Sequence, residues 1–163
     1  MSDKSKFRDW LESHVPEAGQ DSLDPSIPIG AASRLTGLSE SALRKYESAG
    51  LINYYRTEGN YRMLSTEDID RILLIKSLVR EKGLNLEGIR RLWSLIPCWE
   101  LKECSPEIYN DCGVRLDSDR PCWVVRREEN MCGGEECREC VIYRFGSYCT
   151  DDFKTLVYSK LRK

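Results

Sequence analysis

The residues best suited to chemistry in this sequence are its eight cysteines, all of which lie between Cys98 and Cys149. Packing alone does not gather every thiol of a 163-residue chain into one stretch, so the clustering indicates a local use for them. Cys137 and Cys140 form a Cys-x2-Cys pair, a spacing at which two thiolates can bind one metal. The single histidine, His14, is distant in sequence and is expected to be solvated, so a metal site here would use sulfur alone.

Sulfur-only coordination suits an iron–sulfur cluster or Zn²⁺. We favour the cluster, because zinc folds often use two Cys-x2-Cys pairs and this sequence contains one. A disulfide framework is the least favoured use, since a cytoplasmic protein lies in reducing surroundings. A reversible thiol switch among the cysteines stays open.

A cytoplasmic location is expected from the composition. No apolar run approaches the roughly 20 residues that span a bilayer, and the first residues lack the apolar segment of a signal peptide. The net charge is −2, but it is unevenly distributed: residues 1–26 carry −3, residues 27–96 carry +3 and residues 97–163 carry −2. A DNA-binding surface is therefore expected in the middle segment.

That middle segment carries the signals of two short helices joined by a tight turn. Pro28 suits the first turn of one helix and Gly37 suits its end. Ser39 is a favourable N-cap for a second helix, which is expected to stop at Gly50. Two such helices form a helix-turn-helix, in which the second helix is the recognition helix.

The side chains of this helix pair divide into two sets. Leu35 and Leu43 are expected to face the core. The outward set, which would meet the major groove, is expected to include Ser41, Arg44 and Lys45.

A β-hairpin is expected next, because β-prone stretches flank the turn Gly59-Asn60. Arg56 and Arg62 lie on its arms, where a wing places cations beside the phosphate backbone. Ser65 and Asp68 then form a capping box for a further helix. The expected apolar face of that helix is Ile69, Ile72, Leu73, Ile75 and Leu78. A last helix follows Gly83 and ends before Pro97, with Leu86, Ile89, Leu92 and Trp93 inward.

Residues 27–96 resemble the DNA-binding domain of the MerR family of transcriptional regulators. The resemblance rests on Ile29-Gly30, Ala32, Thr36-Gly37, Leu43-Arg44, Tyr46-Glu47, Gly50-Leu51, Gly59, Tyr61-Arg62, Asp68 and Gly83. It implies DNA contacts by Arg44, Tyr46, Arg56 and Arg62, and the full set of residues expected at the DNA is Ser39, Ser41, Arg44, Lys45, Tyr46, Arg56, Asn60, Tyr61 and Arg62. The alternative is that Arg44 and Tyr46 only pack and solvate the helix.

The resemblance also implies double-stranded promoter DNA and RNA polymerase as partners. The chain departs from many members at Ser41 and Lys45, so the operator sequence does not carry over. Typical members continue into a long dimerisation helix, whereas here Pro97 and Cys98 intervene. A homodimer is still expected, through an interface that the sequence does not identify.

The segment 98–143 resembles a small cysteine-rich unit, the two-CW domain. The matching pieces are Cys98-Trp99-Glu100 with Lys102 and Cys104, then Cys112, Cys122-Trp123, Cys132-Gly133-Gly134, and Cys137-x2-Cys140 followed by Tyr143. Cys149 lies outside this pattern and is expected to be a free thiol. The resemblance implies a shared fold, and the expected metal ligands are Cys98, Cys104, Cys112, Cys122, Cys132, Cys137 and Cys140.

The sequence therefore predicts a mainly α protein: a winged helix-turn-helix DNA-binding domain over 27–96, then a small cysteine-rich, metal-stapled domain over 97–149. An N-terminal arm and linker (1–26) precede them, with Phe7, Trp10, Leu11 and Val15 at helical spacing and a linker over 16–22, and a helix over 150–163 follows. The expected function is a regulator whose cysteine module senses redox or metal state. The alternative is a cysteine module that is structural or docks a partner; an enzyme is not expected, because no catalytic signature stands out.

Overall fold

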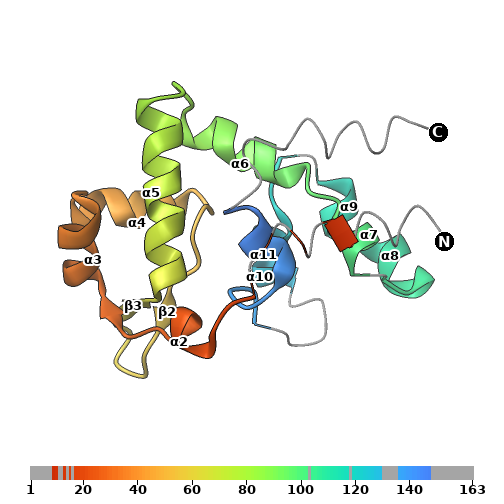
Figure 1. The fold of residues 1–163 in the computed structure, drawn as a ribbon. Helices are drawn as coiled ribbons and strands as arrows, with labels where there is room; N and C mark the ends of the chain where they lie inside the picture. Colours follow the sequence, from red (N-terminus) through yellow and green to blue (C-terminus); the bar gives the residue numbers. More distant parts are fainter. Residues whose placement is uncertain are drawn as a thin grey trace.

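The computed structural model is mainly helical, with one small sheet (Figure 1). It describes residues 9–10, 13, 15, 17–102, 104–117, 119–129 and 136–147. Several predictions fall outside the described residues, namely those on Phe7, Leu11, His14, Cys132, Cys149 and the helix over 150–163.

The helix-turn-helix forms as the capping residues predict. Helix α3 spans Ile29–Thr36, and Gly37 ends it with a positive φ of 66°. Helix α4 spans Glu40–Ser48, and the side chain of Ser39 accepts a hydrogen bond from the backbone N of Ala42 at 3.1 Å.

Of the two leucines expected in the core of this pair, only Leu43 is buried. Leu35 is 62% exposed, so that prediction is wrong. The inward face of α3 is formed instead by Ala32 and Thr36, which lie one turn apart, and Leu35 lies on the exposed side of the helix.

The wing is a hairpin of β2 (Tyr55–Arg56) and β3 (Arg62–Leu64), in which Arg56 lies opposite Arg62. Asn60 takes a φ of 62° in the turn between them. A third strand, β1 (Ile27–Pro28), pairs with the other side of β3, so the strand order is β1-β3-β2. Its two residues are too few for a pattern, which is why the sequence did not reveal it.

Two longer helices complete the first half. Helix α5 (Thr66–Arg80) begins at the predicted capping box, and α6 (Leu86–Ser94) begins at Asn85, whose side chain accepts from the N of Gly88. The expected inward faces are largely confirmed, with Ile72, Ile75, Leu78, Ile89 and Trp93 buried. The prediction for Leu73 is wrong, because this side chain is 40% exposed. A short helix, α2 (Gln20–Leu23), occupies part of the expected linker and packs on α5.

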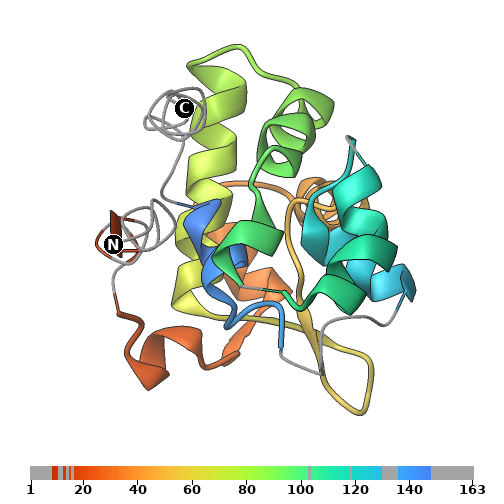
Figure 2. The ribbon, with the colours of Figure 1, turned by 90° about the vertical axis from the view of Figure 1, so that its right-hand side faces the viewer.

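The cysteine region is also helical. Its elements are α7 (Cys98–Leu101), α8 (Pro106–Asp111), α9 (Gly113–Leu116), α10 (Cys122–Glu129) and α11 (Val141–Phe145). Figure 2 shows α11 in blue beside α5, with α8, α9 and α10 gathered on the other side. These helices are short, so each buries its apolar residues only against its neighbours.

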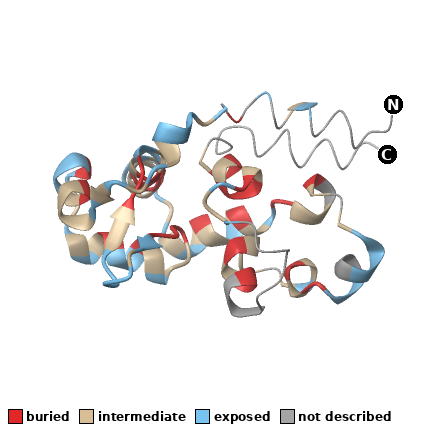
Figure 3. Ribbon diagram, turned by 90° about the horizontal axis from the view of Figure 1, so that it is seen from below, coloured by how far each residue is buried: buried red, intermediate tan, exposed pale blue. Residues whose placement is uncertain are grey.

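One hydrophobic core runs through both halves. It contains Leu43, Leu51 and Ile72 from the helix-turn-helix side and Trp123, Ile142 and Phe145 from the cysteine side. Buried positions accordingly occur on the helices of both halves (Figure 3). The domain boundary near residue 97 stays a prediction, but the packing does not stop there.

Candidate DNA-binding face and candidate metal centre

The recognition helix α4 and the wing present most of the predicted DNA-contacting residues on exposed positions. Exposed on α4 and its cap are Ser39, Ser41, Arg44 and Lys45, and exposed on the wing are Arg56, Asn60 and Tyr61. Tyr61 is 73% exposed at the tip of the hairpin, where nothing in the described core requires an aromatic side chain. Their contacts with DNA stay predictions, but these side chains are open to a partner.

Tyr46 differs from this set, because its side chain is only 7% exposed. Burial raises the pKa of its phenol, while Arg80 nearby lowers it in part. The ring therefore packs in the core, in line with the packing role that was the alternative for this residue.

Glu47 is a residue that the sequence placed in the family motif without a role. Its carboxylate accepts hydrogen bonds from Arg56 Nη2 at 2.8 Å and from Arg62 Nε at 2.7 Å. Burial alone would raise the pKa of Glu47, but the bonds from Arg62 and Arg56 outweigh it and lower the pKa below its usual value. One acidic side chain of α4 thus holds both wing arginines, and the recognition helix and the wing form one unit.

Arg44 makes a looser contact. It pairs with Glu40 one turn earlier at 2.8 Å, with about half of each side chain exposed. Exposed pairs of this kind contribute little to stability, so Arg44 can exchange Glu40 for a phosphate at small cost.

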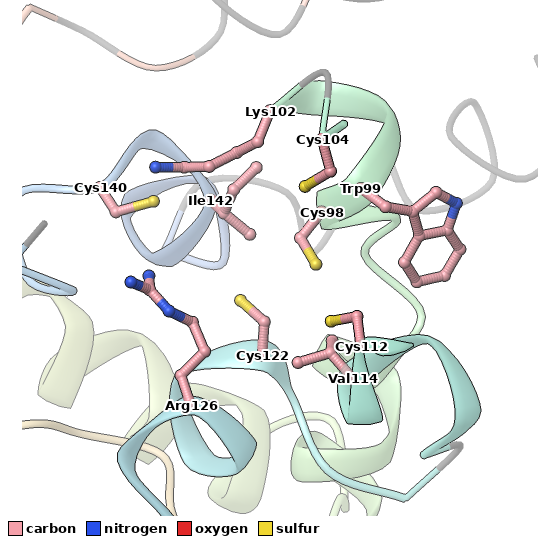
Figure 4. A pocket seen from close by; sticks show the side chains of 10 residues that line it. All are labelled: Cys98, Trp99, Lys102, Cys104, Cys112, Val114, Cys122, Arg126, Cys140 and Ile142. Carbon is pink, nitrogen blue, oxygen red and sulfur yellow. The ribbon is translucent and has the colours of Figure 1, made fainter. Parts of the chain in front are cut away.

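Five of the seven expected metal ligands line one pocket in the cysteine region (Figure 4). They are Cys98, Cys104, Cys112, Cys122 and Cys140. In Figure 4 the sulfur atoms of Cys98, Cys112 and Cys122 point toward one another. Cys137 is not among the residues that line this pocket, although it lies in the turn before Cys140, whose N donates to the O of Cys137.

The surroundings of these thiols favour the thiolate form at Cys98, whereas burial raises the pKa of Cys104. A hydrogen bond from Cys122 lowers the pKa of the Cys98 thiol, with a further contribution from Arg126, and the same bond raises the pKa of Cys122 well above its usual value. Arg126 and Lys102 both line the pocket, and Arg126 is only 8% exposed. A buried cation beside thiolates offsets the negative charge that a thiolate-ligated centre gathers.

The five cysteines that line the pocket are chemically suited to bind a metal ion or an iron–sulfur cluster through thiolates. Among the described residues, however, no three Cys, His, Asp or Glu side chains stand close enough to hold one metal ion. A single Zn²⁺ binds sulfur at about 2.3 Å and therefore needs its ligands almost in contact. A cluster of several iron and sulfide ions is larger and accepts thiolates that lie farther apart around the pocket, although Cys98 and Cys122 are already close enough to share a hydrogen bond. Cys98, Cys104, Cys112 and Cys122 are the residues that would hold it, with Cys140 at the same pocket.

Arg71 is a second residue that sequence reasoning missed. The side chain of Arg71, which projects from α5, is fully buried. Its guanidinium lies 4.2 Å from the ring centroid of Trp93 and 3.9 Å from that of Tyr143. Its Nε donates to the O of Leu51 at 2.8 Å and its Nη1 to the O of Tyr143 at 2.6 Å. An arginine in an apolar helix pattern gives no sequence signal for such a role, because its partners lie from 20 to more than 70 residues away in the sequence.

The geometry of residues 27–95 is that of a winged helix-turn-helix. These residues match the family described as MerR HTH family regulatory protein. The segment is therefore a MerR-type helix-turn-helix domain, as the resemblance implied.

The relatives that this chain is similar to share that segment. It is 43% identical over 68 residues to the HTH-type transcriptional regulator GlnR of Bacillus anthracis, covering 42% of this chain and 52% of the relative. It is 37% identical over 71 residues to the putative heat shock protein HspR of Streptomyces coelicolor, covering 44% and 47%. It is 35% identical over 68 residues to the HTH-type transcriptional regulator HmrR of Sinorhizobium medicae, covering 41% and 46%.

The chain thus spans about half the length of the curated relatives it matches. The resemblance of residues 98–143 to the two-CW domain stays a prediction. No helix in the part of the chain that the structure describes is long and apolar enough to cross a bilayer.

Proposed function

We propose that this protein is a DNA-binding transcriptional regulator that reads a promoter half-site with α4 and clamps the adjacent backbone with its wing. The observation that carries the proposal is the joint exposure of Arg44 and Lys45 on α4 and of Arg56 on the wing, with Glu47 fixing the two elements together. Cations on a rigid helix-and-wing unit suit a groove flanked by phosphates. Regulators among the similar proteins support the same function.

A homodimer would supply a second half-site, and the resemblance to MerR proteins supports RNA polymerase as a partner at the promoter. A single small module gives limited specificity, whereas two modules at a fixed spacing read a longer site. The interface is not assigned to any surface of the described residues.

The cysteine pocket is the proposed sensor. An iron–sulfur cluster held there by Cys98, Cys104, Cys112 and Cys122 would supply a centre whose integrity depends on oxidants and metal supply. Arg126 would offset its charge, and Trp99, Val114 and Ile142, which line the pocket, would limit the access of water. The alternative is structural Zn²⁺ with no sensing role.

The DNA proposal is tested by Arg62→Ala. Loss of one phosphate contact should weaken binding to every sequence and reduce the salt slope by about one unit. The matched control is Arg91→Ala on α6, which removes the same charge from an exposed arginine paired with Glu87 and Asp119. An Arg44→Ala/Arg62→Ala double variant that is folded and binds as well as the parent would refute this face.

The centre is tested by purification without oxygen, with iron, sulfide and zinc measured in the same preparation. Brown protein with iron and sulfide supports the cluster, and colourless protein with stoichiometric zinc supports the structural alternative. Operator affinity is then measured for loaded, oxidised and chelator-stripped protein. A bound centre with unchanged affinity in all three states would refute sensing and leave a structural module.

A further inference from the structure

The segment that joins the recognition helix to the wing, residues 50–55, lies against the cysteine region. Residues 51–54 are buried. The indole Nε1 of Trp123 donates to the O of Gly50 at 2.7 Å. The N of Asn53 donates to the Oη of Tyr143 at 2.9 Å. Both partners belong to the cysteine region, so the joint between the two DNA-reading elements is held from outside the helix-turn-helix.

The residues that hold this joint are close neighbours of cysteines. Trp123 directly follows Cys122, and Tyr143 lies in the helix that begins after Cys140. Arg138, which lies between Cys137 and Cys140, stands 5.1 Å from the ring centroid of Tyr55 at the end of the joint. Because Cys122 and Cys140 line the pocket, a change in the spacing of these thiols moves the backbone that carries the contacts.

Gly50 and Val124 of α10 are packed so closely that the two segments have little room to shift against each other. Gly50 has a φ of 74°, and a Cβ placed there would stand 2.5 Å from a methyl carbon of Val124. Arg71 fills the space beside the joint, between Leu51, Tyr143 and the indole rings of Trp93 and Trp123. Tightly packed contacts of this kind transmit small displacements instead of absorbing them.

We propose that residues 50–55 transmit the state of the cysteine centre to the DNA-binding face, with Trp123 and Tyr143 as positioning residues. The inference deepens the proposed function and rests on it. Thiols held around a centre fix the start of α10 and of α11, and these hold Gly50 and Asn53. The joint then sets the distance between α4 and β2, and so the fit of helix to groove and of wing to phosphate. Loss of the centre releases the joint and weakens operator binding.

Hydrogen exchange tests the physical link without DNA. We compare protein purified without oxygen with the same protein after treatment with a chelator. The amide of Asn53 and the peptides covering 50–55 should exchange faster in stripped protein, while peptides of α3 change much less. Faster exchange across 98–129 with no change in 50–55 would overturn the proposal.

Two conservative variants test the functional link. Trp123→Phe removes the indole donor and replaces the indole with a smaller aromatic ring, and Tyr143→Phe removes the phenol acceptor and keeps its ring. Both should bind as much metal as the parent, while the ratio of operator affinities between loaded and stripped protein falls toward one. In the parent that ratio is expected to be some five- to 150-fold, the usual range of coupling between sites.

The controls are matched in chemistry and place. Trp93→Phe makes the same change in the same aromatic cluster. Thr36→Val removes a comparably buried hydroxyl, which donates to the O of Ala32 within α3 and outside residues 50–55. Both should keep the parental ratio. If Trp123→Phe and Tyr143→Phe keep the parental ratio of operator affinities, the transmission through residues 50–55 is refuted but sensing is not. If the parent itself has a ratio of one, sensing is refuted, and the transmission with it.

Discussion

Helices α4, α5 and α6 each begin at a side chain that accepts a hydrogen bond from the helix backbone, whereas α7, α8, α9 and α11 begin at residues that make no such bond. The first three have nine to 15 residues and the other four have four to six. Short uncapped helices are marginal by themselves. Local capping signals thus specify α4, α5 and α6, whereas α3 begins at Pro28 without a side-chain cap. The cysteine region depends on what it packs against and on what its thiols bind.

The largest expected effect concerns that dependence. Removal of the centre by a chelator, or by a Cys98→Ser/Cys122→Ser double variant, should unfold the short helices of the cysteine region. Since Trp123 and Phe145 belong to the shared core, the helix-turn-helix should lose about 3–5 kcal/mol as well, as for truncation of a large aromatic residue. Circular dichroism with denaturant titration measures both effects. Unchanged stability of residues 27–96 would show that the helix-turn-helix core suffices alone.

Leu43→Ala is the next largest change. Leu43 is fully buried between α3 and the rest of the core, so truncation should cost about 2–5 kcal/mol in the free energy of unfolding. Leu35→Ala on the exposed side of α3 is the matched control and should stay within about 0.5 kcal/mol of the parent. Equal effects of the two variants in denaturant titration would mean that the faces of α3 and α4 are assigned wrongly.

A smaller effect is expected at the helix caps. Ser65→Ala should cost about 0.5–2 kcal/mol, because it removes the side-chain acceptor of the capping box at α5. The matched control is Ser105→Ala. Ser105 is the N-cap of α8, but its side chain makes no capping bond, so this variant should change the unfolding midpoint much less. A larger loss at Ser105 than at Ser65 would reverse the comparison between the two regions.

The smallest effect is the pH dependence due to Glu47. Its folded-state pKa is lowered by the bonds from Arg62 and Arg56, so the stability it contributes is present above the unfolded pKa and is lost as pH falls through the folded pKa. Glu47→Gln should therefore lose less stability than the parent between neutral and acid pH. An identical acid response in both proteins would contradict this role for Glu47.

Local signals in the sequence sufficed where the chain stabilises itself locally. Ser39, Ser65 and Gly37 take the capping positions that their types predict, and the hairpin turns at Gly59-Asn60. The clustering of the cysteines in the sequence indicated a local use for them, and five of them line one pocket. The facing of Leu35 and Leu73 was missed because helical periodicity defines a stripe but not its edges.

Contacts between distant segments could not be predicted in this way. Nothing near Arg71 indicates that its partners are Tyr143 and two tryptophans, because their proximity depends on how the cysteine region packs. Glu47 was visible as part of a motif, yet its bridge to both arms of the wing depends on the twist and register of β2 and β3. Pairing across a sheet or a core is fixed by tertiary structure.

The bond between Asn53 and Tyr143 also has a consequence in time. The two residues are 90 positions apart. A ribosome adding about 5–20 residues per second needs roughly 5–20 seconds to cover that distance. Through most of this interval the recognition helix and the wing have been synthesised, while Tyr143, which holds the joint between them, has not yet been made. A nascent chain therefore acquires the parts that touch DNA first and their correct spacing last, which delays operator binding until the cysteine region has been synthesised.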